Sequence, residues 1–224
     1  NMKIKAIIFD MDGTIIDTTD IWSKATDELI RLQKPDITPE LLQAISKDIH
    51  GLALKATCNL IKGCLNSTDS VEELVNKKIN IVSQLYSKGI NFIPGFQEFY
   101  SYLKVRKLDM AVATNADAYS LKLAKTMLKL DNFFGNHIYD ISYVNNIHKP
   151  NPDVYLYALN KINRQSNQCI AIEDSANGIK AAKSAGIFCI GINTSGDLET
   201  LSEADYIVDK YQDIDLDEIS FKYF

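Results

Sequence analysis

One short stretch near the N-terminus constrains the fold more than any other part of the chain. An apolar run ending in Ile7-Ile8-Phe9 is followed directly by Asp10-Met11-Asp12-Gly13-Thr14. A continuous apolar run of this length is typical of a strand buried on both faces, as in a parallel sheet. Open parallel sheets bind ligands outside the carboxyl ends of their strands, so Asp10 and Asp12 lie where a site is expected.

The two aspartates indicate chemistry as well as position. Carboxylates this close together repel each other unless something compensates their charge. A hard cation with oxygen ligands does so, and Mg²⁺ is common where phosphate is also bound. The alternative is that Asp10 and Asp12 only cap the following turn. One Asp before a Gly would favour capping, whereas two at this spacing after an apolar run favour a metal and phosphate site.

The composition excludes several classes of partner. The 224 residues are 46% hydrophobic and 24% charged, which is ordinary for a soluble globular protein with one domain or a domain carrying an insertion. The net charge of −5 and the pI of about 5.2 favour neither nucleic acid nor an anionic membrane as a partner. No apolar run approaches the roughly 20 residues that span a bilayer.

Cysteine usage indicates the compartment. None of the four cysteines forms a CxxC pair, and Cys169 and Cys189 lie beside apolar runs. Free, buried thiols in a reducing compartment explain this pattern better than disulfides or a zinc site. We therefore expect a cytoplasmic protein.

Between Thr14 and about residue 90 the sequence predicts helices and no strand. Apolar residues recur at three- and four-residue steps, and the predicted helices cover residues 21–32, 39–49, 54–62 and 71–88. We interpret residues 17–92 as an inserted helical-bundle cap.

Strands and helices alternate in the remainder. Predicted strands cover 110–113, 138–144, 169–172, 188–192 and 206–208, and predicted helices lie between them. This alternation is typical of a doubly wound (Rossmann-like) parallel α/β sheet, so residues 1–16 and 93–224 are predicted to form the core. Asp213, Asp215 and Asp217 are interpreted as the solvated face of a polar tail.

Three further strand or connection ends carry polar groups. Thr114-Asn115 offers a hydroxyl and amides near a helix start, Lys149 precedes Pro150, and Glu173-Asp174 is a second acidic pair. Each has an ordinary alternative, as a helix cap or a solvated lysine. Their order along the chain makes a coincidence improbable.

These motifs together resemble the haloacid dehalogenase-like hydrolase superfamily. The resemblance rests on DxDGT at Asp10 to Thr14, on Thr114, on Lys149 and on the acidic pair Glu173-Asp174. The helical insert after the first motif resembles the branch of β-phosphoglucomutase and small-metabolite phosphatases. Single motifs are weak, but the ordered set of four is specific.

The resemblance implies a role for each residue. Asp10 would attack phosphorus and form an aspartyl-phosphate, and Asp12 would act as general acid and then general base. Mg²⁺ would be held by Asp10, the backbone carbonyl of Asp12 and Asp174, with Glu173 acting through water or positioning the others. Lys149, Thr114 and amides near Asn115 would neutralise charge on the phosphoryl oxygens.

Substrate selection is expected from the cap. The candidates are Trp22, His50, Gly51 and Lys55, each of which could instead serve packing or solvation. In β-phosphoglucomutases a histidine is expected where this chain has Trp22, and an arginine soon after the glycine. Here Leu52-Ala53-Leu54 and then Lys55 follow Gly51, which disfavours a mutase.

The sequence thus predicts a Mg²⁺-dependent phosphatase that acts, as a monomer, on a small phosphorylated metabolite such as a sugar or polyol phosphate. A phosphomutase is the main alternative, and a phosphonate hydrolase using Lys55 is a weaker one. A response-regulator receiver would be shorter and would lack the insert. A catalytically silent binding protein would have little reason to keep Asp12.

Overall fold

The computed structural model describes residues 3–49 and 52–224, which form two compact units. One unit comprises Asn1–Asp17 and Ile90–Phe224, and the other comprises Thr18–Gly89. The predicted bounds had placed residues 90–92 with the helices. They group with the sheet because Phe92 bridges to Ile16, and because the amide of Asp17 donates to the carbonyl of Asn91 at 2.9 Å.

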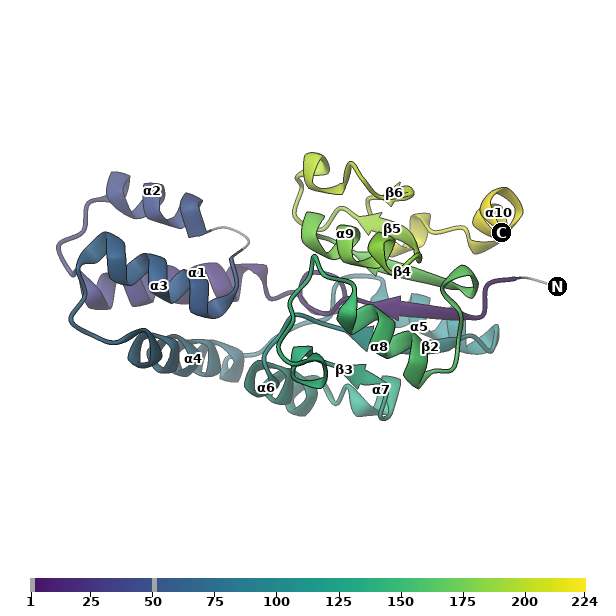
Figure 1. The fold of residues 1–224 in the computed structure, drawn as a ribbon, viewed down its shortest axis with the longest axis horizontal. Helices are drawn as coiled ribbons and strands as arrows, with labels where there is room; N and C mark the ends of the chain where they lie inside the picture. Colours follow the sequence, from purple (N-terminus) through teal and green to yellow (C-terminus); the bar gives the residue numbers. More distant parts are fainter. Residues whose placement is uncertain (1–2, 50–51) are drawn as a thin grey trace. The chain divides into compact units, whose positions relative to one another are not determined.

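The larger unit contains a six-stranded sheet whose paired strands all run parallel (Figure 1). The strand order is β3-β2-β1-β4-β5-β6. The strands are β1 (Ala6–Phe9), β2 (Asp109–Ala113), β3 (Ile138–Tyr139), β4 (Cys169–Glu173), β5 (Phe188–Ile192) and β6 (Tyr206–Val208). This confirms the predicted doubly wound sheet. The order reverses between β1 and β4, and ligands bind at the carboxyl ends of such a switch point.

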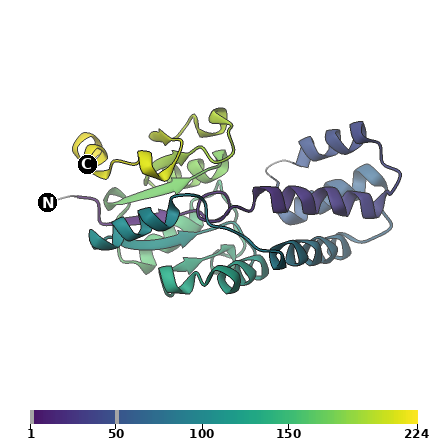
Figure 2. The same ribbon diagram turned by 180° about the vertical axis from the view of Figure 1, so that it is seen from behind.

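Helices cover both faces of the sheet. On one face α8 (Asp153–Lys161) and α9 (Ala176–Ser184) bury small side chains of the central strands, such as Ala111 and Ala171; they lie in front of the sheet in Figure 1. On the other face Phe9 packs edge-to-face on Phe96 of α5 (Phe96–Val105), with ring centroids 5.6 Å apart, and α5 lies in front in Figure 2. Both faces of β1 are therefore buried, as its apolar run predicts.

Two further α-helices and four 3-10 helices also belong to the described part of this unit. They are α6 (Ala118–Leu128), α7 (Asp131–Phe134) and the 3-10 helices η1 (Ile141–Val144), η2 (Ser166–Gln168), η3 (Leu198–Leu201) and η4 (Tyr211–Asp213). The predicted strand 138–144 is wrong after Tyr139. Asp140 turns the chain there, because its carboxylate accepts the amide proton of Ser142 at 2.7 Å and starts η1.

The C-terminal segment is a helix and not the polar tail that the sequence suggested. Asp215 caps α10 (Leu216–Tyr223) by accepting two amide bonds, and Leu216 and Ile219 are buried. Asp217 forms a bidentate ion pair with Arg106, the residue that follows α5. Asp213, Asp215 and Asp217 are exposed, as expected for a solvated face, whereas Ile214 and Leu216, which alternate with them, are buried.

The second unit is a bundle of four helices. They are α1 (Thr19–Gln33), α2 (Pro39–Ile49), α3 (Leu54–Leu65) and α4 (Val71–Ser87). A reciprocal capping box between Ser70 and Glu73 begins α4. Apolar residues at helical spacing, such as Leu74 and Val82, form its buried stripe. Within the described residues of both units, no helix has the length and apolar character needed to cross a membrane.

All four cysteines are free thiols. Cys58, Cys169 and Cys189 are buried, as expected, but Cys64 is exposed because it lies on the outward side of α3.

Candidate active site

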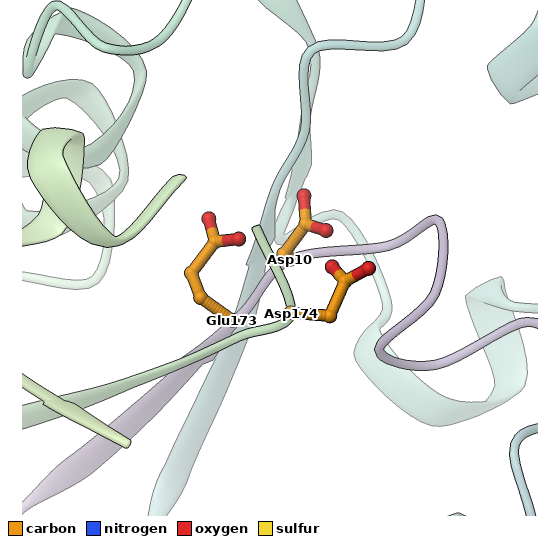
Figure 3. A group of neighbouring side chains, drawn as sticks. All are labelled: Asp10, Glu173 and Asp174. Atoms are coloured by element: carbon orange, nitrogen blue, oxygen red, sulfur yellow. The ribbon is translucent and has the colours of Figure 1, made fainter. Parts of the chain in front are cut away.

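Three carboxylates meet at the carboxyl ends of β1 and β4. Phe9 pairs with Ile172 in the parallel register, so Asp10 and Glu173 leave the two strands side by side. Asp10, Glu173 and Asp174 each offer an oxygen within 4.8 Å of the others, and Figure 3 shows all three side chains pointing to the same side of the strand ends. The strand ends thus bring together the first and fourth motifs of the sequence.

The loop after β1 shapes one wall of this cluster. Gly13 has a φ of +81°, and a Cβ built on it would lie 2.1 Å from Asp174 Oδ2, so only glycine fits. The hydroxyl of Thr14 donates to Asp174 Oδ1 at 3.1 Å. Asp12 is half-buried in the same loop and lies outside the three-carboxylate cluster. The loop therefore orients Asp174 and leaves Asp12 in a separate position for a separate role.

Lys149 supplies a buried positive charge to the cluster. Its Nζ donates to Asp10 Oδ1 at 2.8 Å, to Glu173 Oε1 at 2.6 Å and to the carbonyl of Ala113 at 2.8 Å. Burial alone would lower the pKa of Lys149, but the charges of Asp10 and Glu173 outweigh it and raise that pKa. The ammonium is therefore fixed in its charged form between two carboxylates.

Thr114 and Asn115 lie at the end of β2, as the sequence predicted, but they do different things. Asn115 Oδ1 accepts the backbone amide proton of Lys149 at 2.8 Å, which ties the lysine segment to this strand end. The hydroxyl oxygen of Thr114 accepts the amide proton of Ala116 at 3.0 Å and is almost fully buried. The Thr114 hydroxyl can therefore still donate its own proton, whereas the Asn115 side chain positions Lys149.

Glu173 and Asp174 carry raised pKa values, which indicate that the cluster needs further positive charge. Burial, and then the charge of Asp10, raise the pKa of Glu173 to about 7, although Lys149 and Tyr155 partly offset this. Burial, and then the charges of Asp10 and Glu173, raise the pKa of Asp174 well above its usual range. One ammonium does not neutralise three acidic groups.

The residues present fit a Mg²⁺ ion. Carboxylate oxygens are the ligands this ion prefers, and three converge here. Glu173 Oε2 is buried with no hydrogen-bond partner among the described residues, so one acceptor of the cluster is still unused. The Glu173 side chain has this place because Gly178 of α9 has no Cβ, which would lie 1.9 Å from Oε2.

Tyr155 of α8 contacts the carboxylate cluster, although the sequence analysis did not identify it. Its hydroxyl donates to Glu173 Oε1 at 2.6 Å, and the Lys149 ammonium lies 4.9 Å from the centre of its ring. The available sequence signal was a tyrosine in a predicted helix, three residues after the Lys-Pro-Asn-Pro run. The structure buries this tyrosine fully, and a buried hydroxyl requires a hydrogen-bond partner.

The cap candidates lie in the helical unit or outside the described residues. Trp22 is half-buried on α1, with Lys78 Nζ 5.7 Å from its ring centre. Lys55 is exposed on α3 and faces Glu72 at 3.9 Å. His50 and Gly51 lie outside the described residues.

Lys78, on α4 of the helical unit, is a buried lysine that the sequence analysis did not identify. It occupies the buried stripe of α4 with an exposed fraction of 4%, and burial lowers the pKa of its amine to about 8 despite the opposing effect of Cys58. A lysine at an apolar-stripe position, four residues after Leu74, was the available signal.

Comparison with known proteins extends these observations. A family model described as haloacid dehalogenase-like hydrolase matches residues 7–192. A phosphorylated carbohydrates phosphatase from Thermotoga maritima is 26% identical over 184 residues, covering 82% of each chain. A β-phosphoglucomutase from Bacillus subtilis is 28% identical, covering 96% of this chain and 93% of its own.

The fold also matches solved structures. A family IA, variant 3 hydrolase from Entamoeba histolytica superposes with a TM-score of 0.85 at 24% identity, covering 97% of this chain and 98% of that chain. At this identity the match supports the fold alone, and it agrees with the doubly wound sheet described above.

Proposed function

Since the chain belongs to the haloacid dehalogenase-like hydrolase family, we propose that it is a Mg²⁺-dependent phosphatase of a small phosphorylated metabolite. The reaction proceeds through an aspartyl-phosphate on Asp10. The substrate is a sugar or polyol phosphate. Asp10, Asp12, Thr114 and Lys149 carry the chemistry.

A single observation carries the proposal: Lys149 holds Asp10 by one carboxylate oxygen in a cluster where two further carboxylates converge. The bond to Oδ1 restrains the rotation of the Asp10 carboxylate, and we assign the attack on phosphorus to its other oxygen, Oδ2. The ammonium stays charged and sits where negative charge develops on the transferred phosphoryl group. Asp10 is thus oriented as a nucleophile and not merely buried as a structural acid.

The hydrolysis needs two displacements. Asp10 attacks phosphorus and the substrate oxygen leaves, which requires a proton on that oxygen. Asp12 donates this proton and then takes one from the water that attacks the aspartyl-phosphate. Asp12 lies two residues from the nucleophile, on the loop side of the site, and is separate from the buried cluster.

Mg²⁺ would be held by Asp10, Asp174 and the backbone carbonyl of Asp12. Glu173 would lie beside these ligands. When bound, the ion supplies positive charge to the phosphoryl oxygens and relieves the repulsion among the carboxylates. The two hydrogen bonds that Glu173 Oε1 accepts from Lys149 and Tyr155 favour a positioning role for Glu173 over direct metal contact.

Relatives support the substrate class. One is named as a phosphatase of phosphorylated carbohydrates and another as a hexitol phosphatase from Escherichia coli. The β-phosphoglucomutase of Bacillus subtilis, a relative over nearly the whole chain, favours a phosphomutase as the second candidate. Trp22 and the absence of an arginine between Gly51 and Lys55 weigh against the mutase.

A substrate panel tests the proposal. Phosphate release is measured from sugar, polyol and glycolate phosphates with Mg²⁺ and with EDTA, and the Asp10→Asn variant is measured beside the wild type. Release that requires both the metal and Asp10 supports the phosphatase. If the folded wild type releases phosphate from no compound but converts β-glucose 1-phosphate to the 6-phosphate, the mutase replaces it.

A further inference from the structure

Two hydroxyl groups from the C-terminal part of the chain hold consecutive carbonyl groups of the loop that carries Asp12. Thr194 Oγ1 donates to the carbonyl of Gly13 at 2.6 Å, and the Tyr211 hydroxyl donates to the carbonyl of Thr14 at 2.6 Å. Thr194 follows β5 and Tyr211 begins η4. Both lie beyond residue 192, where the match to the family model ends.

The loop does not satisfy these carbonyls itself. Its internal hydrogen bonds end on other carbonyls: that of Met11 accepts amide protons from Thr14, Ile15 and Ile16 at 3.2, 2.8 and 3.2 Å, and that of Ile16 accepts the amide proton of Gly13 at 2.9 Å. The carbonyls of Gly13 and Thr14 need donors from elsewhere, because a buried carbonyl without one costs free energy. The amides of both residues are thus held within the loop, whereas their carbonyls are held by the C-terminal part of the chain.

The opposite side of the same two residues contacts Asp174. The Gly13 backbone leaves no space for a Cβ against Asp174 Oδ2, and the Thr14 hydroxyl donates to Asp174 Oδ1. Rotation of either peptide would therefore move the groups that orient Asp174.

We propose that Tyr211 and Thr194 are positioning residues for the Mg²⁺ site. Their hydroxyls hold the peptide planes at Gly13 and Thr14, and thereby set the Asp174 carboxylate in the arrangement that binds the ion. This inference rests on the proposed function, since it concerns the metal that function requires.

A purely structural role gives a different expectation. Tyr211 is 2% exposed, and its ring packs on Phe99 at 5.2 Å and on Phe96 at 6.0 Å. If the hydroxyl only satisfied a buried carbonyl, its loss would lower thermal stability and leave the metal affinity of the folded protein unchanged. Residues that orient metal ligands typically alter affinity about 10- to 100-fold when substituted.

The chain offers matched controls for both residues. Tyr211→Phe keeps the ring and removes the hydroxyl, and Tyr100→Phe removes an equivalent hydroxyl that donates to the carbonyl of Phe133 at 2.8 Å. Thr194→Val is matched by Thr126→Val, which removes a hydroxyl bonded to the carbonyl of Lys122 at 2.9 Å. One control bond joins α5 to α7 and the other lies within α6, and neither reaches the 11–16 loop.

The experiment is a calorimetric Mg²⁺ titration of each purified, substrate-free protein, well below its unfolding temperature. We expect Tyr211→Phe to bind about tenfold more weakly than the wild type, the low end of the range for residues behind metal ligands. Thr194→Val should weaken binding in the same direction, and both controls should bind as the wild type does. If Tyr211→Phe does not fold, the Mg²⁺ affinity of Thr194→Val is compared with that of Thr126→Val, and this comparison decides.

The outcomes separate the inference from the function beneath it. Unchanged affinity in Tyr211→Phe and Thr194→Val, with a wild type that binds Mg²⁺, overturns the inference alone. Equal weakening in Tyr100→Phe also overturns it, because a general loss of stability would then explain the result. A folded wild type that binds no Mg²⁺ overturns the inference together with the metal part of the proposed function.

Discussion

Lys149 and Asp10 are 139 positions apart in the chain, yet the lysine ammonium donates to the aspartate carboxylate at 2.8 Å in a buried setting. This pair joins the proposed nucleophile at the end of β1 to a cation carried by the segment before α8. Buried charges persist where they are paired and hydrogen-bonded, and the second carboxylate, Glu173, completes the pairing.

Replacing this cation should abolish most of the activity. We expect Lys149→Met to lower kcat by about 10²- to 10³-fold, the usual loss when one charge-stabilising donor is removed. Steady-state phosphate release at saturating Mg²⁺ measures it. Lys183→Met is the control, because Lys183 also binds a carboxylate, Asp205, and a backbone carbonyl, but at the surface. Activity of Lys149→Met close to that of the wild type would remove Lys149 from the mechanism.

Gly178 allows a test of how tightly Glu173 is confined. Alanine normally stabilises a helix interior by about 1 kcal/mol relative to glycine. In α9 the sign should reverse, because the Cβ of Gly178→Ala would lie 1.9 Å from Glu173 Oε2 and displace that carboxylate. We expect a lower melting temperature and lower phosphatase activity.

The matched variant for this test is Gly63→Ala in α3, where the added Cβ meets nothing within 4 Å. It should raise the melting temperature slightly and leave activity alone. Identical behaviour of the two alanine variants would show that the space around Glu173 is not restricted.

The raised carboxylate pKa values predict how the metal-free protein responds to pH. A group whose pKa is raised on folding contributes stability that is present below its unfolded pKa and is lost as the pH rises through its folded pKa. For Glu173 this window runs from 4.5 to about 7, and the raised pKa of Asp174 acts in the same direction. In EDTA, the free energy of unfolding should therefore fall by up to about 3 kcal/mol for Glu173 across this window.

Mg²⁺ should oppose that fall, because the ion binds deprotonated carboxylates and so stabilises the protein more as the pH rises. Urea unfolding at several pH values, with and without Mg²⁺, measures both effects, and Glu173→Gln should flatten the metal-free curve. A metal-free stability that rises between pH 4.5 and 7 in the wild type, and is unchanged in Glu173→Gln, would contradict the assignment.

Lys78 predicts the opposite slope at higher pH. Burial lowers its pKa to about 8 from 10.5, so the unfolded chain holds a proton that the folded protein has lost between these values. The stability contribution of Lys78 should therefore increase over this range, by up to about 3 kcal/mol. Lys78→Met should remove the increase and stabilise the protein near pH 7, whereas Lys88→Met, at an exposed position of the same unit, should do neither. A Lys78→Met curve parallel to the wild type would refute this.

The sequence predicted the parts of the site that follow from strand topology. Apolar runs locate buried parallel strands, and their carboxyl ends must share one edge, so Asp10, Thr114 and Glu173 could be assigned to one place from the sequence. Lys149 follows no strand directly and was assigned with them through the order of the motifs and the family resemblance. The end of β3 was mispredicted because one side-chain hydrogen bond, from the Ser142 amide to Asp140, outweighs the apolar pattern that follows.

Tyr155, Lys78 and Tyr211 could not be assigned to their roles from the sequence. Each acts through a contact with a residue distant in the chain, and tyrosines and lysines are common in ordinary amphipathic helices. Tyr211 is the extreme case, since its partner Thr14 is 197 positions away and the bond goes to a backbone carbonyl that carries no sequence signal.

In the proposed mechanism, Asp10 becomes phosphorylated during turnover. Chemical trapping of the aspartyl-phosphate tests this step. The enzyme is mixed with Mg²⁺ and its best substrate, quenched in acid during the first turnovers and reduced with borohydride, which converts an aspartyl-phosphate to homoserine. Peptide mass spectrometry then locates the modified position. We expect homoserine at position 10, dependent on substrate and absent from Asp10→Asn. Modification of a different carboxylate, or turnover with position 10 unmodified, would refute an aspartyl-phosphate on Asp10.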